Sequence, residues 1–276
     1  MVEKVVAMEY DAVVEAAVRA LKRAETFLPY WVTKLIEKAA EMETNSVARS
    51  QLLFMLENVH IAQRKGLPIC QDTGLPIFYV ELGHDVKLDF NLKAAVAEGV
   101  RKATRDVPLR PNVVDPFTRE NTNDNVGLCV PDIILSYEFG DELRITAFPK
   151  GAGSENMSLV GMLNPVDDPI KFILNVVAER ASNSCPPLFL GIGIGGSFDM
   201  AARMSKRALL KMPGASELEL KLLEKINSLG IGPMGLGGDT TVLAVKIEKA
   251  SCHTASLPVA INFQCWANRS ATEVLK

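Results

Sequence analysis

The spacing of apolar positions predicts that this chain begins with helices. Over residues 9–66 apolar side chains recur every three or four positions, the spacing of an amphipathic helix. One stripe consists of Val13, Val14, Ala17, Val18 and Leu21, and a second of Trp31, Val32, Leu35, Ile36 and Ala39. A third helix is expected from Ser46, a candidate N-cap, to Gly66, a glycine of the kind that ends helices.

After residue 66 the pattern changes to short β-prone runs separated by further helices. Strands are expected at 76–82, 133–137, 143–148, 241–247 and 257–263. Of these, 133–137 and 143–148 are expected to pair as a hairpin about Gly140-Asp141. Helices are expected at 91–104, at 169–181 and from about Ser197. The predicted fold class is therefore α+β (mixed α/β), a helical N-terminal region followed by a mixed, largely antiparallel sheet flanked by helices.

The expected domain organisation is a single domain over residues 1–276. A chain of 276 residues can bury a sizeable core. No internal repeat, low-complexity tract or linker divides it. The helical residues 1–66 could form a lobe of their own.

The composition and charge of the chain indicate which kinds of partner and location to expect. The 30 basic and 33 acidic residues are mixed along the chain, so no basic stripe suggests nucleic-acid binding. No run approaches the ~18 apolar residues that a membrane helix needs. The first residues, Met-Val-Glu-Lys, lack the apolar segment of a secretory signal. We therefore expect a cytoplasmic protein, and the 48% apolar content favours a buried subunit interface.

The segment Cys70-Gln71-Asp72-Thr73-Gly74 is the first candidate for chemistry. It connects an expected helix to an expected strand, and such connections often present reactive side chains. Taken alone, it could equally be a polar turn that contains a buried cysteine.

Two other polar segments are candidates for binding an anion. Arg110 lies between Pro108 and Pro111, which restrict the backbone, and its guanidinium suits a carboxylate. Residues 150–156 form a glycine-rich turn at a strand end, where backbone amides can approach an anion closely. Each could also be a loop without a ligand.

The glycines of residues 191–196 satisfy the G-x-G-x-x-G pattern of dinucleotide sites. Such a site also needs a second strand ending in an acidic residue about twenty residues later. Here that region begins with Ser216 and Glu219, a capping box that predicts a helix. The surroundings therefore argue against a dinucleotide site.

The five cysteines are unevenly spaced and odd in number, which is a poor disulfide framework. Cys70, Cys185 and Cys265 each adjoin the end of an expected element, whereas Cys129 reads as a small core residue. Three distant cysteines do not match a structural zinc site, whose ligands come in close pairs. They suit an iron-sulfur cluster held at three corners, whose fourth iron could act as a Lewis acid.

Six segments in order along the chain resemble the class I iron-sulfur hydro-lyases, the fumarases and L-tartrate dehydratases. The segments are Cys70-Gln71-Asp72-Thr73-Gly74, Leu109-Arg110-Pro111-Asn112, Gly151-Ala152-Gly153-Ser154-Glu155-Asn156, Asn183-Ser184-Cys185-Pro186-Pro187, Leu229-Gly230-Ile231-Gly232-Pro233 and Cys265-Trp266-Ala267. The resemblance covers essentially the whole chain and matches the α subunit, or N-terminal domain, of that family.

The resemblance implies a 4Fe-4S cluster bound by Cys70, Cys185 and Cys265, with one open iron. It further implies reversible loss of water from a small 2-hydroxy dicarboxylate. The substrate contacts it implies are Gln71, Arg110 and the Gly153 amide.

The acid–base group implied by the resemblance is Asp72, supported by His253. The family's β part supplies further substrate-binding residues, so the resemblance implies a β subunit as partner, in a heterodimer or α2β2 assembly.

Three alternatives remain open. Cys252 beside His253 could be the third ligand, but Cys265 has the family's Cys-Trp-Ala context and is preferred. Residues 153–156 resemble the fumarase form of this loop, which favours fumarate and L-malate over L-tartrate. A chain of another class, an iron-sulfur scaffold or redox sensor, would use the same cysteines without catalysis.

Overall fold

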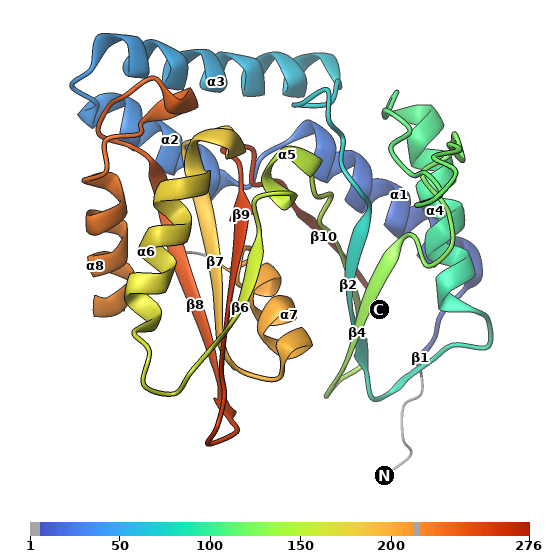
Figure 1. Cartoon of the computed structure of the whole chain (residues 1–276). Coiled ribbons are helices and arrows are strands. Elements are labelled where there is room, and N and C mark those ends of the chain that lie inside the picture. The colour runs from blue at the N-terminus through green and yellow to red at the C-terminus, as the bar shows by residue number, and fades with distance from the viewer. Residues whose placement is uncertain (1–5, 212–215) are drawn as a thin grey trace. The chain divides into compact units, whose positions relative to one another are not determined.

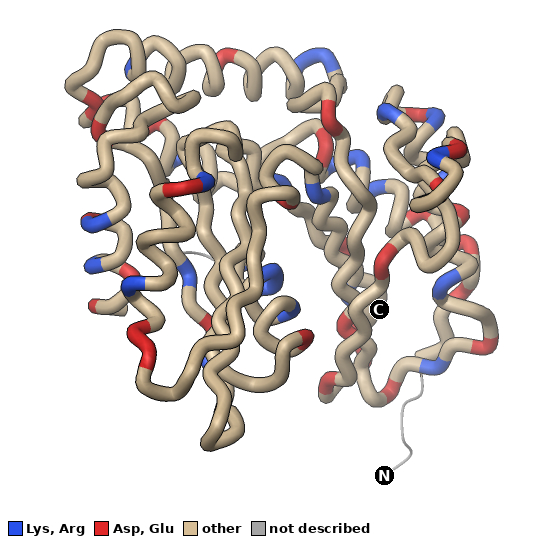
Figure 2. The backbone as a smooth tube through the Cα atoms, in the orientation of Figure 1, with Lys and Arg blue, Asp and Glu red and all other residues tan. Residues whose placement is uncertain are grey.

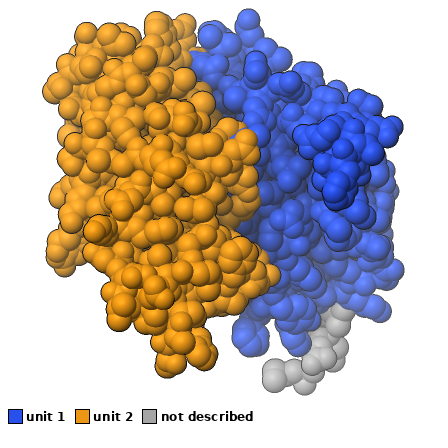
Figure 3. Space-filling view, viewed as in Figure 1, with its two compact units in different colours: residues 1–29, 58–152, 269–276 blue, residues 30–57, 153–268 orange. Residues whose placement is uncertain are grey.

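The computed structural model describes residues 6–211 and 216–276, which form two compact units, each with its own sheet. Unit 1 comprises residues 1–29, 58–152 and 269–276, and unit 2 comprises residues 30–57 and 153–268 (Figure 3). Residues 1–4, whose polarity argued against a secretory signal, lie outside the described residues. Both units combine helices with mixed sheets, which confirms the predicted fold class.

Unit 1 is built on a four-stranded sheet with the order β10–β5–β2–β4 (Figure 1). Its strands are β2 (Ile77–Gly83), β4 (Asp132–Glu138), β5 (Leu143–Ala147) and β10 (Ala271–Leu275). β2 is parallel to β4 and antiparallel to β5, which is antiparallel to β10. Two further short strands, β1 (Val6–Ala7) and β3 (Val86–Lys87), form a separate parallel pair.

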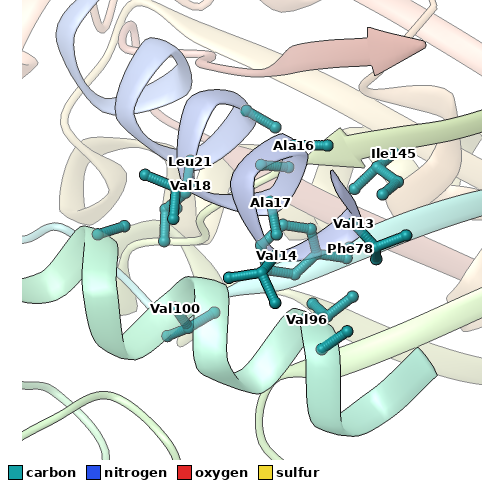
Figure 4. Packing of buried hydrophobic residues seen from close by; sticks show 14 of the residues in the cluster. Val13, Val14, Ala16, Ala17, Val18, Leu21, Phe78, Val96, Val100 and Ile145 are labelled. Carbon is teal, nitrogen blue, oxygen red and sulfur yellow. The ribbon is translucent and has the colours of Figure 1, made fainter. Parts of the chain in front are cut away.

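Helices α1 (Tyr10–Thr26) and α4 (Leu92–Asp106) close the core of unit 1. The N-cap of α4 is Asn91, whose side chain accepts a hydrogen bond from the amide of Ala94. The apolar stripe predicted for α1 is fully or nearly fully buried, and it packs against α4 and the sheet (Figure 4). Burial of these aliphatic side chains is the main stabilising contribution to this unit.

The hairpin predicted between 133–137 and 143–148 is wrong. Both strands form, but β2 lies between them and pairs with each. β2 buries side chains on both faces, whereas most of β4 is exposed, so burial favours β2 at the centre of the sheet. The connection between β4 and β5 instead binds the β2–β3 turn, where the amide of Gly83 donates to the carbonyl of Glu142.

Unit 2 contains a second four-stranded sheet with the order β6–β9–β7–β8. Its strands are β6 (Leu159–Leu163), β7 (Leu188–Gly196), β8 (Val242–Cys252) and β9 (Leu257–Gln264). β9 is antiparallel to both of its neighbours, and β7 is parallel to β8. The helices of this unit are α2 (Tyr30–Met42), α6 (Pro169–Arg180), α7 (Phe198–Ala208) and α8 (Glu217–Asn227). Two 3-10 turns are Ala181–Ser184 and Pro233–Gly235.

Two helices contain a boundary between the units. α3 (Ser46–Lys65) begins in unit 2 and ends in unit 1, and the single turn α5 (Ala152–Glu155) begins in unit 1. The expected helices at 91–104 and 169–181, the helix from about Ser197 and the capping box of Ser216 are confirmed.

The glycines of residues 191–196 lie inside strand β7 and serve helix packing. A Cβ atom at Gly191 would come 1.9 Å from the carbonyl oxygen of Ser205, and one at Gly193 would come 2.2 Å from that of Ala201. Both carbonyls belong to α7, which therefore lies directly against the strand backbone. Leu190 and Ile192, which point to the other sheet face, contribute to the core formed with α6 and α8. The glycine pattern is thus explained by close packing of a helix on a strand.

Charges of both signs are interspersed along the chain, as the sequence suggested (Figure 2). Among the described residues, no helix has both the length and the apolar character needed to cross a membrane.

Candidate active site

The carboxylate of Asp72 is held by backbone amides from two segments of unit 1. Oδ1 accepts a hydrogen bond from the amide of Gly74 at 2.9 Å, and Oδ2 accepts one from the amide of Ala152 at 2.8 Å. The side chain of Asn112 adds a longer contact to Oδ1 at 3.4 Å. Each oxygen thus has its own backbone donor, and the two donors come from different segments. Asp72 is therefore fixed in one orientation.

The end of the Cys70–Gly74 loop is attached to the strand end that precedes residues 151–156. Gly74 has φ +77°, and a Cβ there would come 2.6 Å from the backbone of Lys150. Leu75 and Lys150 exchange two backbone hydrogen bonds, at 2.9 and 3.0 Å. Only glycine allows both this φ and this approach. The pairing brings the amide of Ala152 to Asp72.

Arg110 is brought to the same loop through its backbone. Its carbonyl accepts hydrogen bonds from the hydroxyl of Thr73 at 3.1 Å and from the side-chain amide of Asn125 at 3.2 Å. Its side chain is exposed, as is that of Gln71, whereas Cys70 is half-buried. Unit 1 thus gathers Cys70, Gln71, Asp72 and Arg110 into one hydrogen-bonded group of loops.

A buried ion pair lies against this loop. Glu25, in the last turn of α1, is fully buried and Arg269 is 3% exposed, and their charged groups approach to 3.0 Å. The other terminal nitrogen of Arg269 donates to the carbonyl of Asp72 at 2.6 Å. The contact between Glu25 and Arg269 lacks hydrogen-bond alignment, and both oxygens of Glu25 lack a hydrogen-bond partner among the described residues. Burying such ions costs several kcal/mol each.

Two of the predicted cysteine ligands lie at one end of the unit 2 sheet. Cys185 precedes β7, and Cys265 follows β9. Because these strands are antiparallel and Phe189 pairs with Gln264, the start of one is beside the end of the other. Cys185 is exposed and adopts a left-handed conformation, with φ 55°.

The sulfur of Cys265 receives a hydrogen bond from its neighbour. The side-chain amide of Gln264 donates to Sγ of Cys265 at 3.7 Å and to the carbonyl of Ala267 at 2.9 Å. No disulfide forms among the described cysteines. Cysteine thiolates are the usual ligands of iron-sulfur clusters, and hydrogen bonds to their sulfur atoms tune the reduction potential. Cys185 and Cys265 are therefore chemically suited to binding iron. Among residues 6–211 and 216–276, however, no group of three or more His, Cys, Asp or Glu side chains is placed to hold a metal ion.

His253 lies at the other end of the unit 2 sheet. It follows β8, and Cys252 at the end of that strand pairs with Gly196 at the far end of β7. Gly196 lies seven positions after Phe189 along β7, which is about 23 Å at the rise of a strand. Within unit 2 the structure therefore does not bring His253 or Cys252 to Cys185 and Cys265. This geometry favours Cys265 over Cys252 as the companion of Cys185, and the pairing of His253 with Asp72 stays a prediction.

Gly153 is exposed in the single helical turn α5, and its amide stays a predicted substrate contact. Apart from its own turn, no heavy atom of the described residues lies within 4 Å of the position that a Cβ would take there. Within unit 2 the turn is attached to α7, because Lys206 donates to the carboxylate of Glu155. The space over Gly153 is consistent with close approach of another group to the backbone.

Sequence reasoning missed Glu25, Arg269 and Asn112. Glu25 continues the buried spacing of Val18 and Leu21 on α1, so an acidic residue on an apolar face was the available signal. Asn112 was part of the quoted motif, but its role as a contact of Asp72, Thr73 and Gly74 depends on tertiary structure.

Most of the chain matches a known protein family. The family model described as "Fumarate hydratase (Fumerase)" matches residues 14–274. A Methanocaldococcus jannaschii protein named "Putative L(+)-tartrate dehydratase subunit alpha" is 46% identical over 276 residues, covering 95% of this chain and 97% of the relative. The "L(+)-tartrate dehydratase subunit alpha" of Escherichia coli K12 is 34% identical, covering 90% of this chain and 85% of the relative.

The burial of Glu25 predicts a pH-dependent stability. Desolvation raises the pKa of Glu25 from 4.5 to about 7, with Arg269 opposing this rise and Asp72 adding to it. A carboxyl whose pKa is higher in the folded state binds protons more tightly when folded. Its contribution to stability is therefore full below pH 4.5 and is lost as the pH rises to 7. In the wild type, ionisation of Glu25 should lower the free energy of unfolding by roughly 3 kcal/mol as the pH rises over this range. We expect this decrease to be absent in Glu25→Gln.

The measurement is the free energy of unfolding in urea, for wild type and Glu25→Gln, at pH 5 and pH 8. At pH 5 the free energy of unfolding of the variant should be close to that of the wild type. At pH 8 the variant should be more stable relative to the wild type than it is at pH 5. An equal stability difference at both pH values would contradict the raised pKa.

Proposed function

Because this chain belongs to the fumarate hydratase (fumerase) family, we propose that it is the α subunit of an iron-sulfur hydro-lyase acting on a four-carbon dicarboxylate. The relatives are named as α subunits, which supports a β subunit as its partner, in a heterodimer or α2β2 assembly. The observation that carries the proposal is the carboxylate of Asp72, two residues after Cys70, which accepts a backbone amide at each oxygen, from Gly74 and from Ala152. The predicted cytoplasmic location stays a prediction.

The proposed cofactor is a 4Fe-4S cluster with Cys70, Cys185 and Cys265 as ligands. When bound, such a cluster supplies a Lewis-acidic iron that polarises a hydroxyl and a neighbouring carboxylate. Two of the ligands lie at one end of the unit 2 sheet, and the third is in the loop that holds Asp72.

The side chains of unit 1 then have distinct roles in the proposed mechanism. Arg110, exposed beside the loop, binds a substrate carboxylate through its guanidinium fork, and the amide of Gln71 adds a polar contact. In dehydration, protonated Asp72 gives its proton to the leaving hydroxyl, and a base of the proposed β subunit takes the proton from the adjacent carbon. In hydration the same two groups act in reverse, so Asp72 takes a proton from the attacking water while the β-subunit base returns one to carbon. Its fixed carboxylate suits this step because the proton transfer needs a defined geometry.

Fumarate and L-malate are the first candidate substrates. The family description and the resemblance of residues 153–156 to the fumarase loop support them. L-tartrate is the second candidate, because relatives with 46% and 34% identity are named for it. L-malate and L-tartrate differ by one hydroxyl, so one arrangement of carboxylate contacts could serve both.

The test is anaerobic reconstitution of the full chain with its β subunit, iron and sulfide. Ultraviolet absorbance follows L-malate and fumarate, and a coupled assay follows L-tartrate. We expect turnover of L-malate with a kcat/KM at least about tenfold above that of L-tartrate. The reverse order would assign the tartrate activity. A complex with a full cluster that converts neither substrate would refute the enzyme proposal and favour the redox-sensor alternative.

The cluster ligands predict a specific pattern among the cysteine variants. Cys70→Ser, Cys185→Ser and Cys265→Ser should each lower cluster occupancy, measured as iron and sulfide per reconstituted complex, and lower kcat by about 100-fold or more. Cys129→Ser and Cys252→Ser are the matched controls and should retain the cluster. Loss of the cluster in Cys252→Ser, with retention in Cys265→Ser, would reverse the assignment of the third ligand.

The role of His253 is tested separately, because it rests on the resemblance alone. If His253 supports proton transfer, His253→Gln should lower kcat by about 100-fold, with KM and cluster content unchanged. Wild-type kcat in this variant would remove His253 from the mechanism.

A further inference from the structure

The buried pair Glu25 and Arg269 contacts the backbone of the loop that carries the proposed chemistry. Arg269 donates to the carbonyl of Asp72 at 2.6 Å. The carbonyl of Glu25 accepts from the amide of Ile69 at 2.9 Å. Asn58 donates to the carbonyl of Ile69 at 2.8 Å. Cys70 and Gln71 thus lie between two points at which the backbone is held.

A role in stability alone explains this pair poorly. A buried ion pair is often no more stabilising than apolar side chains of similar volume. Here the contact at 3.0 Å is not aligned as a hydrogen bond, and Nε of Arg269 has no hydrogen-bond partner among the described residues. Arg269 is nevertheless well placed for another purpose, since one nitrogen faces Glu25 and the other binds Asp72.

We propose that Arg269, held by Glu25, is a positioning residue that sets the backbone of the Cys70–Asp72 segment, and with it the direction of the Asp72 carboxylate. Only the expected effect on catalysis rests on the proposed function; the effect on the backbone does not. A guanidinium has two terminal nitrogens in a rigid plane, so it can face a carboxylate and a carbonyl at once. The ammonium of lysine is a single point charge and cannot reproduce that geometry.

Arg269 is also close in sequence to one of the proposed cluster ligands. It follows Cys265 by four residues, within Cys265-Trp266-Ala267-Asn268-Arg269. The peptide that carries one proposed cluster ligand therefore also carries the group that holds the carbonyl of Asp72. Arg269 is the first residue of the last segment of unit 1, two residues before β10.

Two backbone amides report the position of Asp72 without catalysis. The amide of Gly74 donates to Oδ1 and that of Ala152 to Oδ2. If Arg269 sets the direction of this carboxylate, Arg269→Lys should weaken both bonds. Hydrogen exchange resolved to single amides measures this in the full chain before any cluster is added.

The expected result is that Arg269→Lys raises the exchange rate of the Gly74 and Ala152 amides by at least about tenfold. Amides in the middle of β7 should be unchanged. In the reconstituted complex with its β subunit, kcat should fall about 10- to 100-fold with little change in KM. The control is Arg207→Lys, which alters another arginine paired with a buried glutamate, Glu248, in unit 2. It should leave both reporter amides unchanged.

A milder variant guards against loss of folding. Asn58→Ala removes only the bond to the carbonyl of Ile69, and it should raise exchange at Gly74 in the same direction by a smaller factor. Unchanged exchange at Gly74 and Ala152 in both variants would overturn the positioning role. An inactive wild-type complex combined with faster exchange in Arg269→Lys would refute the proposed function while leaving the positioning role intact.

Discussion

Two backbone amides fix the carboxylate of Asp72, and the chemistry of the candidate site depends on them. One amide comes from Gly74 in the same loop, and the other from Ala152 across a β-bridge between Leu75 and Lys150. The bridge is possible because Gly74 takes a positive φ and has no side chain to meet the opposing backbone. The connection between α3 and β2 therefore has a defined conformation at Asp72, because the bridge holds the backbone and the amides hold the carboxylate.

The core of unit 1 and the candidate site share one helix. The buried face of α1 carries Val14, Val18 and Leu21 into the hydrophobic core and continues to Glu25 at the loop. Exclusion of water by that core raises the pKa of Glu25, so the apolar packing and the charge cannot be treated separately. Burying the two ions of the pair with Arg269 costs several kcal/mol each, and a buried ion pair is often no more stabilising than apolar side chains of similar volume.

In unit 2 the sheet topology decides which candidates meet. Antiparallel pairing of β7 with β9 brings Cys185 and Cys265 to one end and leaves His253 at the other. The same strand β7 shows how a motif can mislead, since its glycines allow α7 to approach the backbone. The match of the family model over residues 14–274 agrees with the resemblance drawn from six short segments.

The long helices, most of the strands and the family of this protein could be predicted from the sequence, because helical periodicity, caps and short motifs are local properties. The strands β6 and β10 were not expected. The stripe of α1, the capping box of Ser216 and the segment Cys70–Gly74 could all be read directly. Tertiary structure alone decided that β2 separates β4 from β5 and that Arg269 meets Glu25 and Asp72. It also decided that His253 is far from Cys185. Those outcomes depend on which surfaces compete for burial across long sequence separations, and no local pattern encodes that competition.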